Sequence, residues 1–468
     1  MEIADEYIPL RVSYGANVPE GIPMKVRQAL AVAVIVWSSV LISRPALAQL
    51  VQQGPKLVGA GATGLPLQPH QGTSVALSAD GNTAIVGGST DNTVNCPFPF
   101  CVTGTGAAWI WTRSAGGWTQ QGNKLVGSGA LGFSEQGTSV SLSADGNTAI
   151  VGGPRDNNSA GAAWVWTRSG GVWTQQGNKL VGFDAVGAAD QGSSVSLSAD
   201  GNTAIVGGPG DAGAGAAWIW TRSGGVWTQQ GNKLVGSGAV GPFPANQGQS
   251  VSLSADGNTA IVGGHFDNGG AGAAWIWTRS GGVWSQQGSK LAGTGASSVS
   301  LSADSNTAII GVGGGAGGAW IWTRTGGVWS QQGNKLVGSG AVGNAAQGTS
   351  VSLSGDGNTA VVGGSGDDGG AGATWVWTRS GAVWTQQSMK LVGSGAAGSA
   401  AQGFSVALSA DGNTAIVGGP ADNNSIGAAW VFFRSSVADP SSIPAASAWM
   451  LLALALVLTV LGALRTRA

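Results

Sequence analysis

The chain has 468 residues, of which 9% are charged, and a formal net charge of -1. This balance offers no basic surface for nucleic acid and no acidic tract for cationic partners. Its 84 Gly residues are typical of low complexity, but 21 Trp residues and a hydrophobic content of 42% supply material for a packed core.

The N-terminal segment has the features of an export signal. From Met24, a basic start at Lys25 and Arg27 leads into an apolar run and the small-x-small sequence Ala46-Leu47-Ala48. We therefore predict a signal peptide over residues 24–48, cleaved after Ala48. Residues 1–23 carry acidic side chains that do not suit a signal peptide. This leaves Met1 and Met24 as alternative starts, with residues 1–23 a mis-assigned extension if Met24 is used.

Residues 49–435 are built from a repeat. Its most regular part, Ser-Ala-Asp-Gly-Asn-Thr-Ala or a close variant, occurs seven times, with the aspartate at Asp80, Asp145, Asp200, Asp256, Asp304, Asp356 and Asp411. The second copy reads QGTSVSLSADG, NTAIVGG, GAAWVWTRSGG and VWTQQGNKLVG. Alternating and β-branched apolar residues predict strands, and Asp-Gly and Ser-Gly-Gly predict hairpins between them. Each repeat should thus form four antiparallel strands.

Seven such units predict an all-β fold, a seven-bladed β-propeller of four-stranded antiparallel blades. Residues 50–58 align with a fourth strand, whereas the last repeat stops after its third strand at Arg434. We expect the N-terminal strand to complete the last blade and close the ring, leaving no free sheet edge at the seam. A stacked solenoid would instead have distinct capping repeats, which the sequence lacks.

The tryptophans of the repeat region lie on the third and fourth strands, as Trp109, Trp111 and Trp118 do in the first blade. Because they recur in every blade, we interpret them as blade-to-blade core rather than as a ligand platform. Arg113 and its equivalents should stack on Trp rings.

The C-terminal segment is predicted to be a linker with a sorting motif, residues 436–447, followed by a transmembrane helix and basic tail, residues 448–468. The uncharged run from Ala448 to Leu464 is just long enough to span a membrane. Arg465 and Arg467 should stay on the cytoplasmic side. A plain membrane anchor is the alternative.

One acidic position recurs between the second and third strands and gives weak calcium candidates. An aspartate followed by Asn is most simply an Asx-turn, and no run of several acidic ligands accompanies it. The six candidates are Asp91, Asp156, Asp211, Asp267, Asp367 and Asp422.

Few residues could carry catalysis. His70 and His265 are the only histidines, and Glu135 is the only glutamate after the signal peptide. No catalytic or phosphate-binding motif surrounds them, so we expect no enzyme and no cofactor beyond weakly predicted calcium. Cys96 and Cys101, the only cysteines, flank a short insertion, and we predict that they form a disulfide in an exported protein.

Two motifs resemble known families. The pattern Gly-x-Ser-Val-x-Leu-Ser-x-Asp-Gly-Asn-Thr-Ala-Ile-Val-Gly-Gly, then Gly-Ala-Ala-Trp-Val-Trp-Thr-Arg, resembles bacterial FG-GAP repeat proteins, relatives of the integrin α-chain propeller. The tail resembles the IPTL-CTERM sorting signal of Gram-negative bacteria at Ile443, Pro444, Ser447 and Trp449. These resemblances imply a seven-bladed binding propeller, exported through the inner membrane, transiently anchored by its C-terminal helix, and processed by a sorting transpeptidase.

The sequence therefore favours a non-enzymatic, secreted or cell-surface propeller for binding or adhesion. Its partner would be an extracellular protein or a glycan, and not nucleic acid. Two alternatives remain. A propeller enzyme acting on polysaccharide would need charged clusters in the channel loops of several blades. A purely structural envelope protein would show near-identical blades with none set aside for a ligand.

Overall fold

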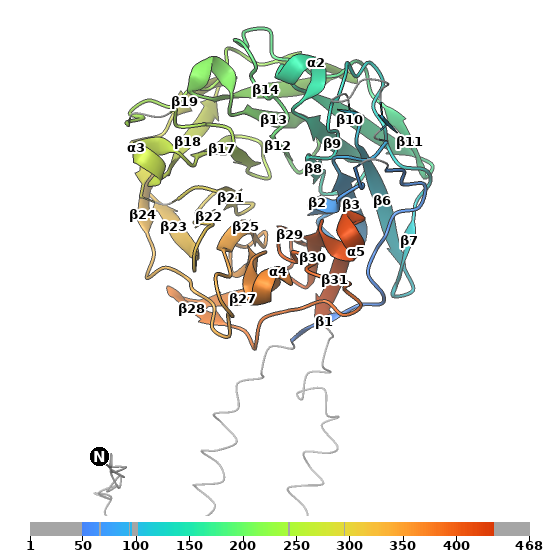
Figure 1. Cartoon of the computed structure of the whole chain (residues 1–468). Helices are drawn as coiled ribbons and strands as arrows, with labels where there is room; N and C mark the ends of the chain where they lie inside the picture. Colours follow the sequence, from blue (N-terminus) through green and yellow to red (C-terminus); the bar gives the residue numbers. More distant parts are fainter. Residues whose placement is uncertain are drawn as a thin grey trace, which may run out of the picture. The chain divides into compact units, whose positions relative to one another are not determined.

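The repeats fold into a ring of β-sheets in this computed structural model (Figure 1). The structure describes residues 49–64, 67–92, 94–95, 102–241, 244–293 and 295–434, which belong to one compact unit. Within these residues, seven sheets of four antiparallel strands form the blades, and one of the seven gains a short fifth strand. The predicted seven-bladed propeller is confirmed.

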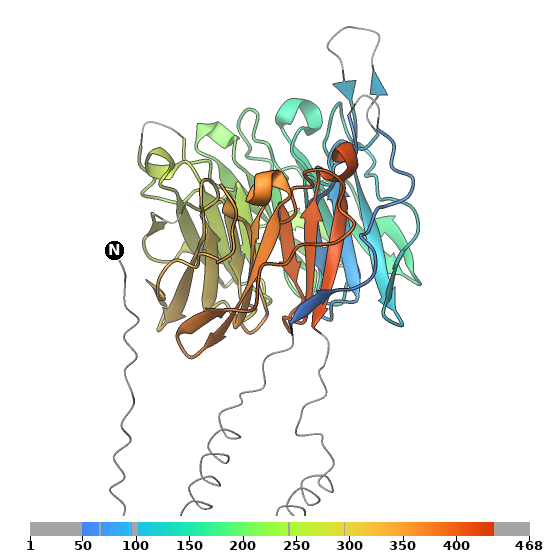
Figure 2. The same cartoon turned by 60° about the horizontal axis from the view of Figure 1, so that its bottom comes forward.

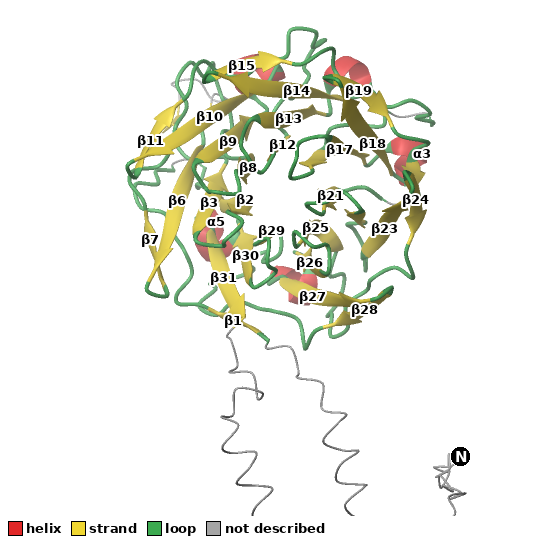
Figure 3. Cartoon of the chain, turned by 180° about the vertical axis from the view of Figure 1, so that it is seen from behind, coloured by secondary structure: helices red, strands yellow, loops and turns green. Residues whose placement is uncertain are grey.

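Four strand positions repeat from the centre of the ring outward (Figures 1 and 3). The innermost strands are β2 (Gln71–Leu77), β8 (Ser139–Leu142), β12 (Ser194–Leu197), β16 (Ser250–Leu253), β21 (Ser298–Leu301), β25 (Gln347–Leu353) and β29 (Ser405–Leu408). The second strands are β3 (Thr83–Gly88), β9 (Thr148–Gly153), β13 (Thr203–Gly208), β17 (Thr259–Gly264), β22 (Thr307–Gly311), β26 (Thr359–Gly364) and β30 (Thr414–Gly419).

The outer half of each blade follows the same order. The third strands are β6 (Ala107–Ser114), β10 (Ala162–Ser169), β14 (Ala216–Ser223), β18 (Ala273–Ser280), β23 (Ala319–Thr325), β27 (Ala373–Ser380) and β31 (Ala428–Arg434). The outermost are β7 (Gly117–Gln120), β11 (Val172–Gln175), β15 (Val226–Gln229), β19 (Val283–Gln286), β24 (Val328–Gln331), β28 (Val383–Gln386) and β1 (Leu50–Gln52). The extra strand β20 (Leu291–Ala292) pairs with β18.

The N-terminal strand closes the ring as predicted. β1 pairs antiparallel with β31, with Leu50 opposite Arg434 and Gln52 opposite Phe432. Leu50 and Leu57 are both buried in the seam. The last blade is therefore completed by the first strand of the ordered chain.

The two faces of the ring differ. One, which we call the turn face, carries the Asp-Gly turns between first and second strands. The other, the loop face, carries the connections between second and third strands and between consecutive blades. Figure 2 shows the short helices on the loop face, with the strands β4 (Val94–Asn95) and β5 (Val102–Thr103) projecting beyond it. The helices are α2 (Asp156–Ser159), η1 (Asp211–Gly213), α3 (Asp267–Gly270), α4 (Asp367–Gly370) and α5 (Asp422–Ser425).

The core lies between neighbouring blades. One cluster joins Ile150 and Val165 of the second blade to Val206 and Trp218 of the third, all buried. The first Trp of the third strand is fully buried in six blades, and a loop glycine lies against its ring, as Gly127 does at Trp164. A methyl group at Gly127 would overlap that ring, which explains the glycine of Leu-x-Gly in these six blades. The predicted structural role of the Trp residues is confirmed.

The blades are also joined at the turn face by a closed circle of backbone hydrogen bonds. The residue before each turn aspartate donates its N–H to the equivalent residue of the next blade at 2.8 to 3.2 Å. The circle runs through Ala79, Ala144, Ala199, Ala255, Ala303, Gly355 and Ala410, which bonds back to Ala79. These bonds fix the inner ends of neighbouring blades to one another at the turn face.

Candidate binding site on the loop face

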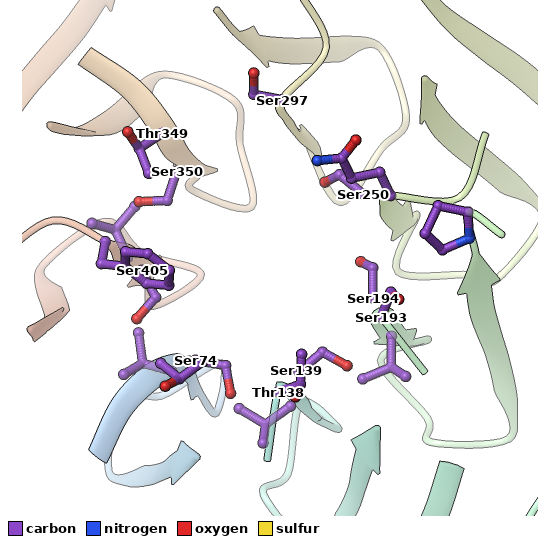
Figure 4. Close-up of a pocket in the computed structure, with 18 of the residues that line it drawn as sticks. Ser74, Thr138, Ser139, Ser193, Ser194, Ser250, Ser297, Thr349, Ser350 and Ser405 are labelled. Carbon is purple, nitrogen blue, oxygen red and sulfur yellow. The ribbon is translucent and has the colours of Figure 1, made fainter. Parts of the chain in front are cut away.

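The mouth of the central channel on the loop face is a cavity of about 590 Å³. Figure 4 shows hydroxyl side chains from all seven blades around an open centre. Those labelled there are Ser74, Thr138, Ser139, Ser193, Ser194, Ser250, Ser297, Thr349, Ser350 and Ser405. A cavity of this volume is within the usual range for small-molecule sites.

The Gln-Gly pair of the repeat positions these hydroxyls. The buried Gln136 side chain accepts the N–H of Gly127 at 2.6 Å and donates to the Gly127 carbonyl at 3.1 Å. It thereby fixes the loop between two blades just before Thr138 and Ser139 begin the innermost strand. The same paired bond recurs between Gln71 and Gly59 and between Gln402 and Gly393. In these blades the buried glutamine therefore holds the loop that precedes the innermost strand.

Most of the ring hydroxyls donate their protons to backbone carbonyls, whereas Ser194 and Ser250 instead accept the N–H groups of Val251 and Val299, at 3.0 and 2.9 Å. Thr138 Oγ1 donates to the Glu135 carbonyl at 2.8 Å, and Ser139 Oγ donates to the Gly192 carbonyl of the next blade at 2.7 Å. Equivalent bonds are made by Thr73, Ser74, Ser193, Ser298, Thr349, Ser350 and Ser405. A hydroxyl has one proton and two lone pairs. Where the proton is committed in this way, the hydroxyl faces the cavity as a hydrogen-bond acceptor.

Two phenylalanines add aromatic rings to the lining of this cavity. Phe404 stands where other blades have Thr138, Ser193 or Thr349, and its side chain is 42% exposed. Phe266 precedes α3 and is 44% exposed. Both line the cavity, and all the described residues that line it are uncharged.

A charged cluster, which the sequence reasoning missed, lies beside the cavity. Arg155 lies between two carboxylates, 3.9 Å from Glu135 and 3.7 Å from Asp190. Burial raises the pKa of Glu135, Arg155 opposes the rise, and Asp190 adds to it. One sequence signal could have pointed to this cluster, because the residue before each Gln-Gly changes from blade to blade. The structure gives this residue a positive φ. The residues at this position are His70, Glu135, Asp190, Asn246, Ala346 and Ala401.

The two histidines stay apart, as expected from the sequence. His70 Nδ1 lies 2.7 Å from Thr90 Oγ1, and burial lowers the pKa of this imidazole. His265 Nδ1 lies 2.8 Å from the Gly295 carbonyl oxygen and 3.1 Å from Ser297 Oγ. Each ring thus bonds to a neighbouring loop and not to the other histidine.

The six aspartates weakly predicted to bind calcium are buried and paired with lysine. Asp156 Oδ2 lies 2.5 Å from Lys179 Nζ, and Oδ1 accepts the Leu131 N–H at 2.7 Å. The lysine is that of the Lys-Leu pair following each outermost strand. The other pairs are Lys56 with Asp422, Lys124 with Asp91, Lys233 with Asp211, Lys290 with Asp267 and Lys390 with Asp367.

This pairing changes the interpretation of these aspartates. The N–H that binds Oδ1 comes from the loop preceding the blade's first strand, so the carboxylate joins two loops and the simple Asx-turn was wrong. Both carboxylate oxygens of Asp156 already have partners, and we therefore do not propose calcium there. Within the described residues, no three His, Cys, Asp or Glu side chains gather closely enough to hold a metal ion.

The predicted stacking of the repeat arginines is confirmed in six blades. Arg168 Cζ lies 5.4 Å from the Trp173 ring centroid, and its Nε donates to Asn147 Oδ1 at 2.9 Å. Gln121 of the preceding blade accepts from both Arg168 and Trp173, at 3.2 and 3.0 Å. Arg113, Arg222, Arg279, Arg324 and Arg379 lie over their own Trp rings. These cations thus hold blades together.

Several predicted features lie outside the described residues. They are the signal peptide with Ala48, the pair Cys96 and Cys101, the sorting residues Ile443, Pro444, Ser447 and Trp449, and the helix of 448–468. Among residues that are described, no helix is long and apolar enough to cross a membrane.

Comparison with known proteins gives fold-level similarity to solved structures. No protein-family model matches the chain, and no curated protein matches its sequence. The periplasmic gluconolactonase of Pseudomonas aeruginosa is 15% identical, with 69% of this chain and 86% of that chain covered and a TM-score of 0.46. A putative 6-phosphogluconolactonase from Bacteroides uniformis is 13% identical, with 69% and 85% covered and a TM-score of 0.46.

A functionally unknown protein from Desulfotomaculum acetoxidans is 14% identical, with 68% of this chain and 88% of that chain covered and a TM-score of 0.45. The propeller fold of this chain rests on its own strand pairing. The names of these structures say nothing about its ligand or activity.

Proposed function

We propose that the protein is an exported, non-enzymatic propeller that binds an extracellular ligand in the loop-face cavity. The proposal rests on the positions at which the repeat sequence differs from blade to blade. The buried Asp-Lys pairs and stacked arginines recur in six blades each. Cavity and rim positions vary instead, with Phe266, Phe404, Glu135 and Arg155 each replaced by a different residue in the other blades. Variation at one concave surface of a constant scaffold is typical of a binding site.

Export and surface location form part of the same proposal. The signal peptide of residues 24–48 and the tail from Ile443 support translocation and processing by a sorting transpeptidase in a Gram-negative envelope. The resemblance of the repeat to FG-GAP proteins supports a binding role outside the cell. The partner would be an extracellular glycan or protein.

A glycan array probed with the purified protein, with product analysis of every spot, tests the proposal. Specific retention of a ligand without chemical change supports it, whereas turnover of any glycan would overturn the non-enzymatic assignment. Fractionation of the native host with intact-mass measurement tests the location. A mature chain starting near Gln49 and lacking the residues after Ala448 is expected.

The charged cluster favours a second candidate, an enzyme acting on polysaccharide. Glu135 has a raised pKa, as a general acid requires, and Asp190 lies on the other side of Arg155. Glycoside hydrolysis uses two carboxyl groups that flank the scissile bond. The same product analysis distinguishes this candidate from a binding protein.

A further inference from the structure

We infer that the ligand of the loop-face cavity is an uncharged oligosaccharide, and that Phe266 and Phe404 are the surfaces on which its sugar rings lie. This inference rests on the proposed binding function and gives its ligand a chemical class. Three features of the cavity carry it: the absence of charge from its described lining, the state of its hydroxyls and the two exposed aromatic rings.

The lining matches a ligand rich in hydrogen-bond donors. The hydroxyls of Thr138, Ser139 and Ser193 all donate to backbone carbonyls, at 2.7 to 2.8 Å, and keep only acceptor capacity toward the cavity. Sugar hydroxyls supply the missing donors. A charged ligand would enter a cavity whose described lining offers no opposite charge, at a high desolvation cost.

The aromatic rings are not required by the scaffold. Phe266 has φ -93° and ψ 2°, nearly the same backbone as Gly366, which precedes α4 with φ -88° and ψ -4°. Phe404 donates its N–H to the Ala401 carbonyl at 3.1 Å, just as Thr138 does to Glu135 at 3.2 Å. Other blades therefore fold equivalently with small or polar residues at both positions. A large apolar side chain left half exposed where the fold does not need it is typical of a contact residue.

A peptide is the competing occupant, and the cavity fits it less well. A peptide backbone brings equal numbers of donors and acceptors, and its carbonyls would face mostly hydroxyl oxygens whose protons are already used, with Ser194 and Ser250 as the exceptions. The aliphatic faces of sugar rings, by contrast, cover Phe rings while their hydroxyls reach the acceptors around them.

The test is calorimetric titration of the purified protein with the best ligand of a neutral-glycan array. The variants Phe404→Thr and Phe266→Ala introduce residues that the repeat uses elsewhere, so both should keep the wild-type melting temperature. Each should raise Kd by on the order of tenfold. Phe183→Ser is the matched control, because Phe183 is 73% exposed and bonds to Gln229 of the outermost strand β15. Phe183→Ser also introduces the serine that other blades have at this position. The Kd of this variant should match that of the wild type.

The outcomes separate this inference from the proposed function. Glycan binding that Phe404→Thr and Phe266→Ala leave unchanged would overturn the inference while retaining a binding protein. Binding of peptides with no neutral glycan bound would do the same. Turnover of the glycan would overturn the proposed function itself.

Discussion

At the scale of single residues, each of the buried aspartates on the loop face has a lysine where a bound cation could lie. Asp156 is fully buried, and its carboxylate is neutralised by Lys179, whose side chain is 17% exposed. Removing one partner of a buried pair leaves an uncompensated charge, which is far more costly than the net value of the pair. The pair should therefore matter for folding rather than for ligand binding.

We predict that Lys179→Met lowers the free energy of unfolding by about 3 to 5 kcal/mol, because Asp156 would remain buried without its counter-ion. The control is Lys335→Met in the fifth blade, where Lys335 has no acidic partner among the described residues and glycines replace the aspartate. Chemical denaturation of both variants measures the difference. Equal stabilities would contradict the assigned role of the ion pair.

Contacts between residues that are far apart in the sequence could not be predicted from it. The aspartates and lysines were both visible as repeated positions, but they lie more than twenty residues apart, and only the blade geometry brings them together. The Glu135, Arg155 and Asp190 cluster spans two loops in the same way. Contacts between distant loops depend on how the blades are closed, which local propensity does not encode.

At the scale of elements, the Asp-Gly turns were predictable because all their contacts are local. Asp145 Oδ1 accepts the Asn147 N–H at 2.9 Å and the Ser143 hydroxyl at 2.5 Å. Burial alone would raise the pKa of Asp145, but these bonds, that of the Asn147 side chain and the Arg168 charge hold it below the ordinary value of 3.8. Hydrogen bonds of the same kind lower the pKa of the turn aspartate in all seven blades, from Asp80 to Asp411.

These turns predict acid sensitivity. A carboxyl group with a lowered folded pKa contributes stability that is complete above its unfolded pKa and is lost as the pH falls through the folded pKa. We expect these turns to leave the melting temperature nearly independent of pH around neutrality. The melting temperature should fall steeply once the pH is below the ordinary pKa of 3.8. Asp145→Asn should reduce that slope in a pH series of thermal melts. An unchanged slope would contradict the assignment.

Closure of the ring by β1 gives a second prediction at this scale, which a deletion tests. Deleting residues 49–58 removes the buried Leu50 and Leu57, worth about 1.5 to 3 kcal/mol each, and leaves Asp422 without Lys56. It also exposes the edge of β31. We expect a destabilised, aggregating protein by size-exclusion chromatography and thermal melting.

A circular permutant provides the matched control for this deletion. Residues 49–58 placed after Arg434 through Ser-Gly-Gly would reproduce the hairpin that joins β10 to β11 in the second blade. It should restore the monomer and most of the melting temperature. A deletion that melts like the wild type would show that the seam does not hold the ring.

At the scale of the whole molecule, the repeat predicted the ring but not its functional asymmetry. Seven near-identical units predicted the blade count, the four strands and the closing strand, all of which the structure confirms. The sequence did not indicate that Thr138, Phe266 and Phe404, from three separate blades, line one cavity. Their proximity arises only when closure brings the same position of every blade to the channel mouth. The binding role of that cavity is still a proposal.

The most direct measurement is a crystal structure of the purified protein with the best ligand from the neutral-glycan array. We predict electron density for the ligand in the loop-face cavity, with a sugar ring against Phe404 or Phe266 and its hydroxyls within hydrogen-bond distance of the ring formed by Thr138, Ser193 and their equivalents. Ligand density on the turn face or along the outermost strands, with the cavity holding only solvent, would contradict the proposal.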